Sequence, residues 1–563
     1  MLKKWFSAPV FHTELAILLR SFRSELLMVG LLSFIANVLM LSPTIYMLQV
    51  YDRVMLSHSE LTLVTISTIL IFLFIVLAVS EWLRTRLLVR IGIKFDKLLS
   101  RRVFQATFRE KLGASPLNAM EAISDMNGIR TFITGSGIFA FFDLPWSPLY
   151  IYICYQLHPL LGWTAFGSAV LFLLMTLGSE RVMKKKVQEA MTERLNENTL
   201  IAAKLKNPEL VESLGMASKL YRYWMKRHTK SVIAQDESSF LSSNLTAASK
   251  FIRLTQASLV LAVGAWLVTL GELRPSAMIA ASLLVARGVQ PIDSIVSTWE
   301  QFLMAKVSYE RLSALLQKNP IWKFQSFPMP PQGKIEFRDL YAFAEGRDEP
   351  ILRGLNIDFK VGQAVAIMGP SGSGKSTLSR CLLGVWAEVK GGVYLDGHNI
   401  RDYDREELGP HIGYLPQDIE LFAGTIAQNV ARFGEINNEA VIKACEQAGI
   451  HNAILSLPRG YDTSILQTSG FLSGGQRQRL GFARALYGDP VLLLLDEPNA
   501  NLDHEGEQFL FKAILSLKAQ GKTIFIVAHT ANILTCVDQV LRIRDGEIES
   551  FRPAEESQKL LQA

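Results

Sequence analysis

The sequence predicts a membrane α-helical bundle of six spanning helices, followed by an α/β domain. Long apolar runs recur only in the first part of the chain. The last part instead alternates β-branched and apolar runs with amphipathic stretches and glycine turns, a pattern typical of α/β domains. Of the 563 residues, 49% are hydrophobic and 20% are charged. Such a chain is too apolar for an ordinary soluble protein and long enough for two or more domains.

Six apolar segments in the first part are near the length that a helix needs to cross a hydrocarbon layer of roughly 30 Å. They cover residues 26–50, 61–82, 138–157, 160–178, 254–270 and 275–295. We therefore assign residues 1–325 to a transmembrane domain. The charged stretches after the second and fourth segments are predicted as cytoplasmic helical extensions, which either act as spacers or carry motion between domains.

The placement of basic residues predicts the orientation of this domain. The short turns after the first, third and fifth segments hold only Arg53 and Arg274. The long stretches carry the other basic residues that flank the segments, at Lys3, Lys4, Arg20, Arg23, Arg84, Arg86, Arg90, Lys94, Lys97, Arg101, Arg102, Arg181, Lys184, Lys185 and Lys186. Because basic loops stay in the cytoplasm, both termini are predicted there. The net charge of +6 is thus explained without a nucleic-acid partner.

A proline-rich connector at Phe327–Gly333 marks the predicted domain boundary. Three prolines in so short a span favour a stiff, extended chain over a helix. We assign residues 326–563 to the α/β domain.

The segment Gly369–Ser376 fits the phosphate-binding pattern G-x-x-x-x-G-K-[ST], between the predicted strand Ala364–Met368 and a predicted helix. Backbone N–H groups and the helix N-terminus attract phosphate oxygens, Lys375 is expected on the β- and γ-phosphates, and Ser376 on Mg²⁺. A chance glycine loop is the alternative. The candidate ATP-binding residues here are Gly369, Pro370, Ser371, Gly372, Ser373, Gly374, Lys375, Ser376 and Thr377.

Two adjacent carboxylates follow the apolar run Val491–Leu495. We expect Asp496 to hold the metal and Glu497 to act as general base toward the attacking water. A solvated acidic turn fits poorly with so apolar a strand.

Further motifs in this domain resemble those of the ABC ATPases. Leu472–Gln476, reading LSGGQ, matches the ABC signature, and the segment up to Leu486 matches its helix. Gln417 resembles the Q-loop residue, Asn501–Asp503 the D-loop, and His529 the switch histidine. These motifs follow the family's order, so the domain is identified as a P-loop ABC ATPase.

The resemblance implies a dimer, most simply a homodimer, in which each ATP lies between one P-loop and the partner's signature. The residues expected to bind ATP in trans are Ser473, Gly474, Gly475, Gln476 and Asp503. The resemblance also implies that His529 contacts the γ-phosphate and that Gln417 reaches Mg²⁺ and links the metal to the membrane domain. We expect Glu497, His529 and Gln417 to be the catalytic set.

Two departures from the family pattern are visible. Ala344 stands where the family often has an aromatic residue against adenine, so either Tyr341 or Phe343 substitutes or stacking is weak. Gln467 stands where many exporters have a glutamate before the signature, which puts that contact to the cytoplasmic helices in doubt.

Three patterns in the membrane half resemble ABC exporters of type I secretion systems, closest to the branch that exports proteases and lipases. They are Leu41–Arg53, Phe141–Tyr150 with His158–Gly162, and Ala277–Pro291 with Trp299. The resemblance implies ATP-driven export of unfolded protein with a C-terminal secretion signal, from a bacterial inner membrane. It also implies a membrane fusion protein and an outer-membrane channel as partners.

Two other functions stay open at this point. An exporter of lipids, small molecules or peptides would share the ATPase motifs but not the three membrane patterns. A soluble ABC-type ATPase acting on DNA or ribosomes is disfavoured by six spanning segments.

Two ionisable residues inside the spanning segments are candidates for the translocation path. Charges there are costly and usually face a cavity or a partner. Asp143 lies in the third segment and Arg287 in the sixth. For Arg287, pairing within the bundle is an equal alternative.

Overall fold

The computed structural model describes residues 13–112, 119–135, 137–204, 208–321, 325, 327–344, 346–465 and 472–562. The chain forms two compact units. One comprises Met1–Lys111 and Ser115–Pro320, and the other Leu112–Ala114 and Ile321–Ala563. The first unit thus ends at Pro320, and the second continues from Ile321. The boundary predicted from the sequence lies five residues later, after residue 325.

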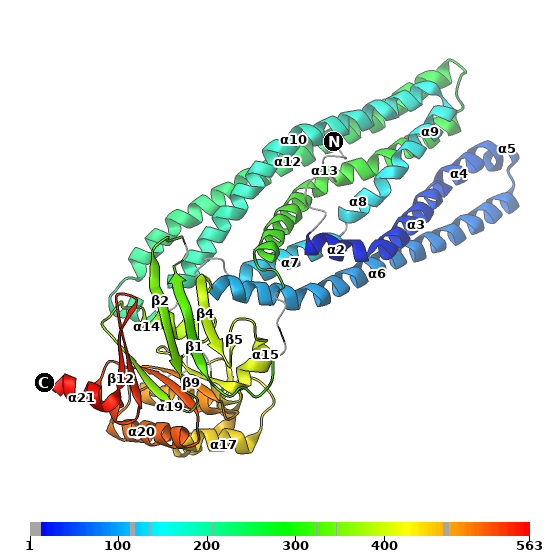
Figure 1. The fold of residues 1–563 in the computed structure, drawn as a ribbon. Helices are drawn as coiled ribbons and strands as arrows, with labels where there is room; N and C mark the ends of the chain where they lie inside the picture. Colours follow the sequence, from blue (N-terminus) through cyan, green and yellow to red (C-terminus); the bar gives the residue numbers. More distant parts are fainter. Residues whose placement is uncertain are drawn as a thin grey trace. The chain divides into compact units, whose positions relative to one another are not determined.

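The first unit is helical (Figure 1). Its α-helices are α2 (Glu14–Ser21), α3 (Arg23–Leu39), α4 (Ser42–Gln49), α5 (Met55–Ser57), α6 (Glu60–Leu112), α7 (Ala119–Thr134), α8 (Gly137–Asp143), α9 (Ser147–Leu157), α10 (Pro159–Lys204), α11 (Pro208–Ser213), α12 (Ala217–Thr269) and α13 (Pro275–Lys318). A π-helical turn, Val50–Val54, joins α4 to α5, and a 3₁₀ turn, Leu144–Trp146, joins α8 to α9.

Among the described residues, five helical stretches are long and apolar enough to cross a membrane. They are Arg23–Ser57, Glu60–Glu110, Gly137–Leu157, Ala217–Thr269 and Pro275–Lys318. A shorter apolar stretch, Pro159–Met175, opens α10. The helix α6 alone has 53 residues, which at 1.5 Å per residue is about 80 Å, well over twice the hydrocarbon thickness. The structure therefore continues the spanning helices far beyond the apolar segments.

Prolines and short turns divide the first and third predicted segments. The first predicted segment is not one helix, because α3 ends at Leu39 and α4 begins at Ser42 with proline in its first turn. Pro145 lies in the 3₁₀ turn after α8, where a missing N–H costs no helical hydrogen bond. Pro291 lies inside α13 and removes one such bond.

In the second unit, the described residues form three sheets, and Figure 1 labels several of their strands. The strands are β1 (Ile335–Phe343), β2 (Pro350–Phe359), β3 (Ala364–Met368), β4 (Val389–Leu395), β5 (His398–Asn399), β6 (Ile412–Leu415), β7 (Gly424–Thr425), β8 (Ser464–Ile465), β9 (Leu492–Asp496), β10 (Thr523–Val527), β11 (Gln539–Arg544) and β12 (Glu547–Pro553). The sheets have the orders β2-β1-β4-β5, β12-β11-β3-β10-β9-β6 and β7-β8.

Helices accompany these sheets. They are α14 (Lys375–Leu382), α15 (Arg405–Leu408), α16 (Ile426–Val430), α17 (Asn438–Gln447), α18 (His451–Leu455), α19 (Gly474–Leu486), α20 (His504–Ala519) and α21 (Ala554–Gln562). Side chains of the central parallel strands alternate between two apolar clusters. Leu493 and Leu495 join one cluster, whereas Leu492 and Leu494 join the other. A strand buried on both faces needs the unbroken apolar run that the sequence shows.

Candidate functional site

The register of three parallel strands brings the predicted ATP-site motifs to one edge of the six-stranded sheet. Val527 at the end of β10 pairs with Ile367 of β3 on one side and with Asp496 of β9 on the other. The phosphate-binding loop follows β3, and His529 follows β10. Ligands of parallel α/β sheets bind at such carboxyl ends.

The glycines of the loop allow backbone paths that side chains would block. Gly374 has φ +100°, and a Cβ there would lie 2.8 Å from Leu352 Cδ2. At Gly369, a Cβ would lie 2.1 Å from the carbonyl oxygen of Ile543. The loop therefore requires glycine at both positions, for conformation at the first and for close packing at the second.

Lys375 begins α14, and its ammonium is folded into the loop. Its Nζ donates to the carbonyl oxygens of Gly369 and Pro370, at 2.8 Å each. Burial lowers the pKa of Lys375, while the nearby carboxylates of Glu497 and Asp496 oppose that shift. The buried hydroxyl of Ser373 finds no hydrogen-bond partner in the part of the chain that the structure describes. These donors suit a phosphate group.

Asp496 is a buried carboxylate, 6% exposed, at the end of β9. Within the described residues, its side chain makes no hydrogen bond or ion pair, and the charges of His529, Lys375 and Arg380 offset its burial only in part. Burial, and then the charge of Glu497, raise the pKa of Asp496. A buried, unpaired carboxylate is costly unless a cation joins it, so this residue, with the exposed hydroxyl of Ser376, fits an oxygen-ligated Mg²⁺.

Glu497 lies between two polar side chains. Its Oε2 accepts a hydrogen bond from Gln417 Nε2 at 3.1 Å, and its Oε1 lies 3.0 Å from His529 Nε2. The backbone of Glu497 is left-handed, with φ +48°. Such a conformation is strained for a residue with a long side chain and is typical of functional sites.

The signature helix α19 begins with a capping box. Ser473 Oγ accepts from the backbone N–H of Gln476 at 3.2 Å, and Gln476 Oε1 accepts from the N–H of Ser473 at 2.9 Å. Ser473 and Gly474 are exposed. A Cβ on Gly475 would lie 2.9 Å from the carbonyl oxygen of Asn501. The helix thus presents an open, positively polarised N-terminus, held close to Asn501–Asp503 of the same chain.

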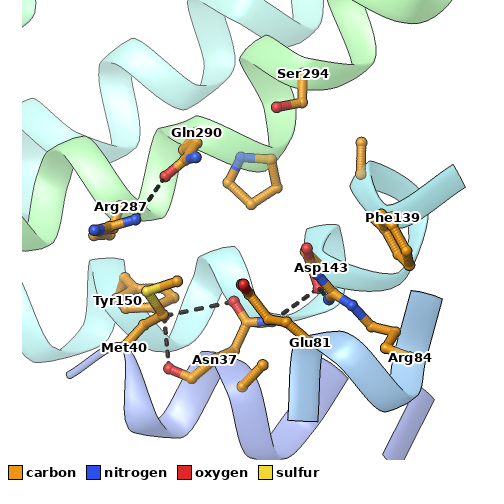
Figure 2. Close-up of a pocket in the computed structure, with 13 residues that line it drawn as sticks. Asn37, Met40, Glu81, Arg84, Phe139, Asp143, Tyr150, Arg287, Gln290 and Ser294 are labelled. Atoms are coloured by element: carbon orange, nitrogen blue, oxygen red, sulfur yellow. Dashed lines mark hydrogen bonds and ion pairs between the residues drawn. The ribbon is translucent and has the colours of Figure 1, made fainter. Parts of the chain in front are cut away.

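A polar cavity of about 160 Å³ lies inside the helical unit (Figure 2). Arg84 of α6 donates to Asp143 Oδ1 at 2.9 Å, and Asn37 of α3 donates to the same oxygen at 2.9 Å. Tyr150 of α9 donates to the carbonyl oxygen of Asn37 at 2.7 Å. Figure 2 shows Arg287 on the α13 side of this cavity, where its guanidinium donates to Gln290 at 3.2 Å.

Family comparisons identify both units. The model of the ABC transporter family matches residues 352–500, and that of the ABC transporter transmembrane region matches residues 26–290. The type I secretion system ATP-binding protein PrsD of Rhizobium meliloti (strain 1021) is 38% identical over 547 residues, which are 97% of this chain and 94% of the relative. This chain belongs to the type I secretion ATP-binding proteins of the ABC transporter family.

Other relatives agree with this membership. The leukotoxin export ATP-binding protein LtxB of Aggregatibacter actinomycetemcomitans is 27% identical over 516 residues, 89% of this chain and 71% of that protein. A leukotoxin translocation ATP-binding protein LktB of Mannheimia haemolytica is 26% identical over 514 residues, with the same coverage. A bacterial Atm1-family ABC exporter with ATP bound shares the fold, with TM-score 0.82, 20% identity, and coverage of 96% of this chain and 98% of that one.

The ABC transporter is therefore a multi-pass membrane protein with an ATPase domain that hydrolyses ATP to drive transport. In its ATPase domain, the structure brings together the predicted loop, the two carboxylates, Gln417 and His529. It gives some predicted residues additional local contacts. Asp503 caps α20 by accepting from the N–H of Gly506 at 2.9 Å, and Gln476 completes the capping box.

The two candidate adenine-stacking residues lie at the end of β1, where the pairing with β2 is irregular. Ala342 between them is fully buried, whereas Tyr341 and Phe343 are each half-buried. The ring of Tyr341 approaches Gly354, where a Cβ would lie 2.9 Å from the Tyr341 hydroxyl. Ala344 directly follows the strand. Gln467 lies outside the described residues.

Sequence reasoning missed two residues of this ABC transporter that tie its motifs together. Gln478 on α19 is 2% exposed and donates to the carbonyl oxygen of Pro498 at 3.2 Å. Asn499 Nδ2 donates to Thr530 Oγ1 at 3.3 Å and to Glu507 Oε1 at 3.1 Å. The sequence signal that could have pointed to these two amides is their position. Each lies within or beside a motif, at a place where no contact with a ligand was expected.

Proposed function

We propose that this chain is the ABC component of a type I secretion system, exporting unfolded protein across the bacterial inner membrane. One observation carries the proposal: 38% identity to PrsD extends over 97% of the chain, so it includes the membrane half as well as the ATPase motifs. ABC motifs alone do not define a cargo. Relatives named for leukotoxin export and translocation, at lower identity over 89% of the chain, support the same class of substrate.

The chemistry at the sheet edge follows from the positions of its side chains. Backbone N–H groups of the loop and Lys375 bind the phosphates, and Ser371, Gly372 and Thr377 complete the cradle. Ser376, Asp496 and Gln417 hold Mg²⁺, which supplies positive charge to the phosphate oxygens.

Glu497 accepts a proton from the attacking water, and His529 contacts the γ-phosphate. The hydrogen bond from Gln417 and the 3.0 Å approach of His529 Nε2 hold the carboxylate of Glu497 in place. Asp496 stays with the metal, since its burial favours a bound cation over solvent. Tyr341 and Phe343 are the aromatic candidates against adenine.

The complete site requires two copies of the chain. The exposed N-terminus of α19, with Ser473, Gly474 and Gly475, is suited to bind the γ-phosphate held by a partner's loop. Gln476 positions Ser473 through the capping box, and Asp503 lies beside this surface. A homodimer is the simplest assembly with two such sites.

The membrane domain is oriented with both termini in the cytoplasm, by the distribution of basic residues. The partners of the exporter are a periplasmic membrane fusion protein and an outer-membrane channel protein. Its cargo is an unfolded protein that carries a C-terminal secretion signal.

Arg287 and Asp143 line the translocation path, in keeping with their place beside one polar cavity in the helical unit. Asp143 already neutralises Arg84, whereas the guanidinium of Arg287 donates only to the nearby Gln290 among the contacts of the described residues. Arg287→Ala is expected to reduce export with ATP hydrolysis retained. Unchanged export would remove the path-lining role.

The proposed function is tested by the ATPase activity of the full chain in proteoliposomes. Synthetic C-terminal peptides of candidate cargo proteins, added on the nucleotide side, are expected to stimulate hydrolysis, whereas scrambled peptides are not. Stimulation by lipids or small molecules, with none by any peptide, would contradict protein export.

A further inference from the structure

Arg102 of α6 joins three helices through one guanidinium. Its Nε and Nη2 donate to the two carboxylate oxygens of Glu14 on α2, at 2.8 and 3.1 Å. The same Nη2 donates to the carbonyl oxygen of Leu316 at 3.2 Å and to that of Asn319, at the end of α13. The side chain is only 12% exposed. Binding a carboxylate and two carbonyl oxygens at once requires the several fixed N–H donors of a planar guanidinium group.

Two residues about two turns further along α6 hold the same end of α13. Arg109 donates to the carbonyl oxygen of Pro320 at 3.0 Å. Glu110 accepts from Lys318 Nζ and from Asn319 Nδ2, at 2.8 Å each. Carbonyls that a helix leaves unpaired at its C-terminus are thus bound by a neighbouring helix. We call Arg102, Arg109 and Glu110 the α13 clasp.

The position of the α13 clasp in the chain suits it to transmit movement between the connector and the membrane cavity. The helix α13 contributes Arg287 to the membrane cavity, ends at Lys318, and precedes the proline-rich connector at Phe327–Gly333 in the chain. The helix α6 contributes Arg84 to the same cavity. A movement of the connector therefore reaches both cavity-lining helices if their cytoplasmic ends are bound to each other.

Apolar packing between α6 and α13 fixes their relative position less specifically than the hydrogen bonds of the α13 clasp. Val103 of α6 and Leu312 of α13 belong to one buried cluster, but apolar contact is non-directional and permits sliding along the helix axis. Charge-assisted hydrogen bonds to defined carbonyl oxygens fix the register of the two helices.

We propose that Arg102 is a positioning residue that couples ATP hydrolysis to transport, by locking the end of α13 to α6 and α2. This inference rests on the proposed export function. Arg102 lies in the helical unit and not in the ATPase domain, so we expect its loss to reduce export without removing ATP hydrolysis.

The test compares wild type, Arg102→Gln, Arg102→Lys and the control Arg90→Gln, which removes an exposed arginine from the same helix. Full-length protein in proteoliposomes is assayed for basal hydrolysis, cargo-stimulated hydrolysis and cargo exported per ATP. For Arg102→Gln, we expect basal hydrolysis within about twofold of wild type and export per ATP at least about tenfold lower. Arg102→Lys, which keeps the charge but not the fork, is expected to lie between them.

A covalent link in place of the α13 clasp tests whether export can be restored. In R102C/N319C, a short thiol-reactive cross-linker is expected to restore export per ATP, whereas either single variant gains nothing. The four native cysteines are all buried, so they do not compete for the reagent.

The outcomes separate the claims. The inference is overturned if Arg102→Gln exports as much protein per ATP as wild type. It is also overturned if basal hydrolysis, export and thermal stability all fall together and cross-linking of R102C/N319C restores none of them. A wild type that hydrolyses ATP but exports no protein overturns the proposed function, and this inference with it. The inference is supported if Arg102→Gln hydrolyses ATP with little export, the cross-link in R102C/N319C restores export per ATP, and Arg90→Gln behaves as wild type.

Discussion

His529 Nε2 lies 3.0 Å from Glu497 Oε1, although the two residues belong to segments separated by the whole of α20. The contact arises because β9 and β10 are adjacent parallel strands, paired Val527 to Asp496, and each residue follows the end of its strand. Gln417 holds the other carboxylate oxygen at 3.1 Å. Two neighbouring side chains therefore hold the carboxylate that we propose as base.

Glu497→Gln is expected to retain ATP binding and to lose hydrolysis by about 10²–10⁴-fold, because an amide of the same shape cannot accept the proton. Phosphate release and bound nucleotide in the purified protein measure the two effects. Glu505→Gln, an exposed change in the first turn of α20, serves as the control. Hydrolysis at the wild-type rate in Glu497→Gln would exclude the assignment.

Gly475→Ala is expected to lower the hydrolysis rate by at least about tenfold, since the added Cβ displaces the N-terminus of α19 from its working position. The Cβ would lie 2.9 Å from the carbonyl oxygen of Asn501, closer than real contacts allow. Gly409→Ala is the matched control, because a Cβ there meets nothing within 4 Å. Equal rates for both variants would show that this N-terminus does not matter for hydrolysis.

Asp496→Asn is expected to stabilise the ATPase domain at pH 7, by on the order of 2 °C in thermal midpoint, while abolishing hydrolysis. Burial raises the pKa of Asp496 above its ordinary value of 3.8. A carboxyl with a raised folded-state pKa costs stability when ionised, and this cost disappears as the pH falls below the unfolded-state pKa.

The difference in midpoint between Asp496→Asn and wild type should therefore shrink as the pH is lowered from 7 toward 4. Thermal unfolding without nucleotide, at several pH values, measures it. A variant less stable than wild type at pH 7 would contradict a net cost of ionising this buried carboxyl in the folded protein.

Asp143→Asn is expected to destabilise the helical unit by about 3–5 kcal/mol, because it leaves the Arg84 guanidinium buried without its anion. Arg84 is 8% exposed. Asp52→Asn is the control: its partner Arg274 is largely exposed, and such a pair contributes about 0–1 kcal/mol.

Unfolding of the purified protein in detergent measures the loss, and the double variant Asp143→Asn with Arg84→Gln is expected to regain part of it. A single variant as stable as wild type would mean that the pair is not a structural link among α3, α6 and α8.

Much of the ATPase domain was predictable because its motifs are local. The strand Ala364–Met368 has the predicted bounds, and the apolar run before Asp496 could only be a buried strand. Glycine positions in the loop follow from short-range sterics. Relations among distant segments were not readable in this way: the amides of Gln478 and Asn499 gained their roles only when α19, the Glu497 turn and the His529 loop were brought together.

The membrane half shows the same division more strongly. Sequence by itself determined the number and place of apolar segments, their predicted orientation, and the family to which they belong, because hydrophobicity and charge act on each segment separately. Tertiary structure alone decided that Asp143 neutralises Arg84 and that Arg102 binds the end of α13. Those partners are set by helix packing, in which one guanidinium reaches whatever carboxylate or carbonyl oxygen the fold places beside it.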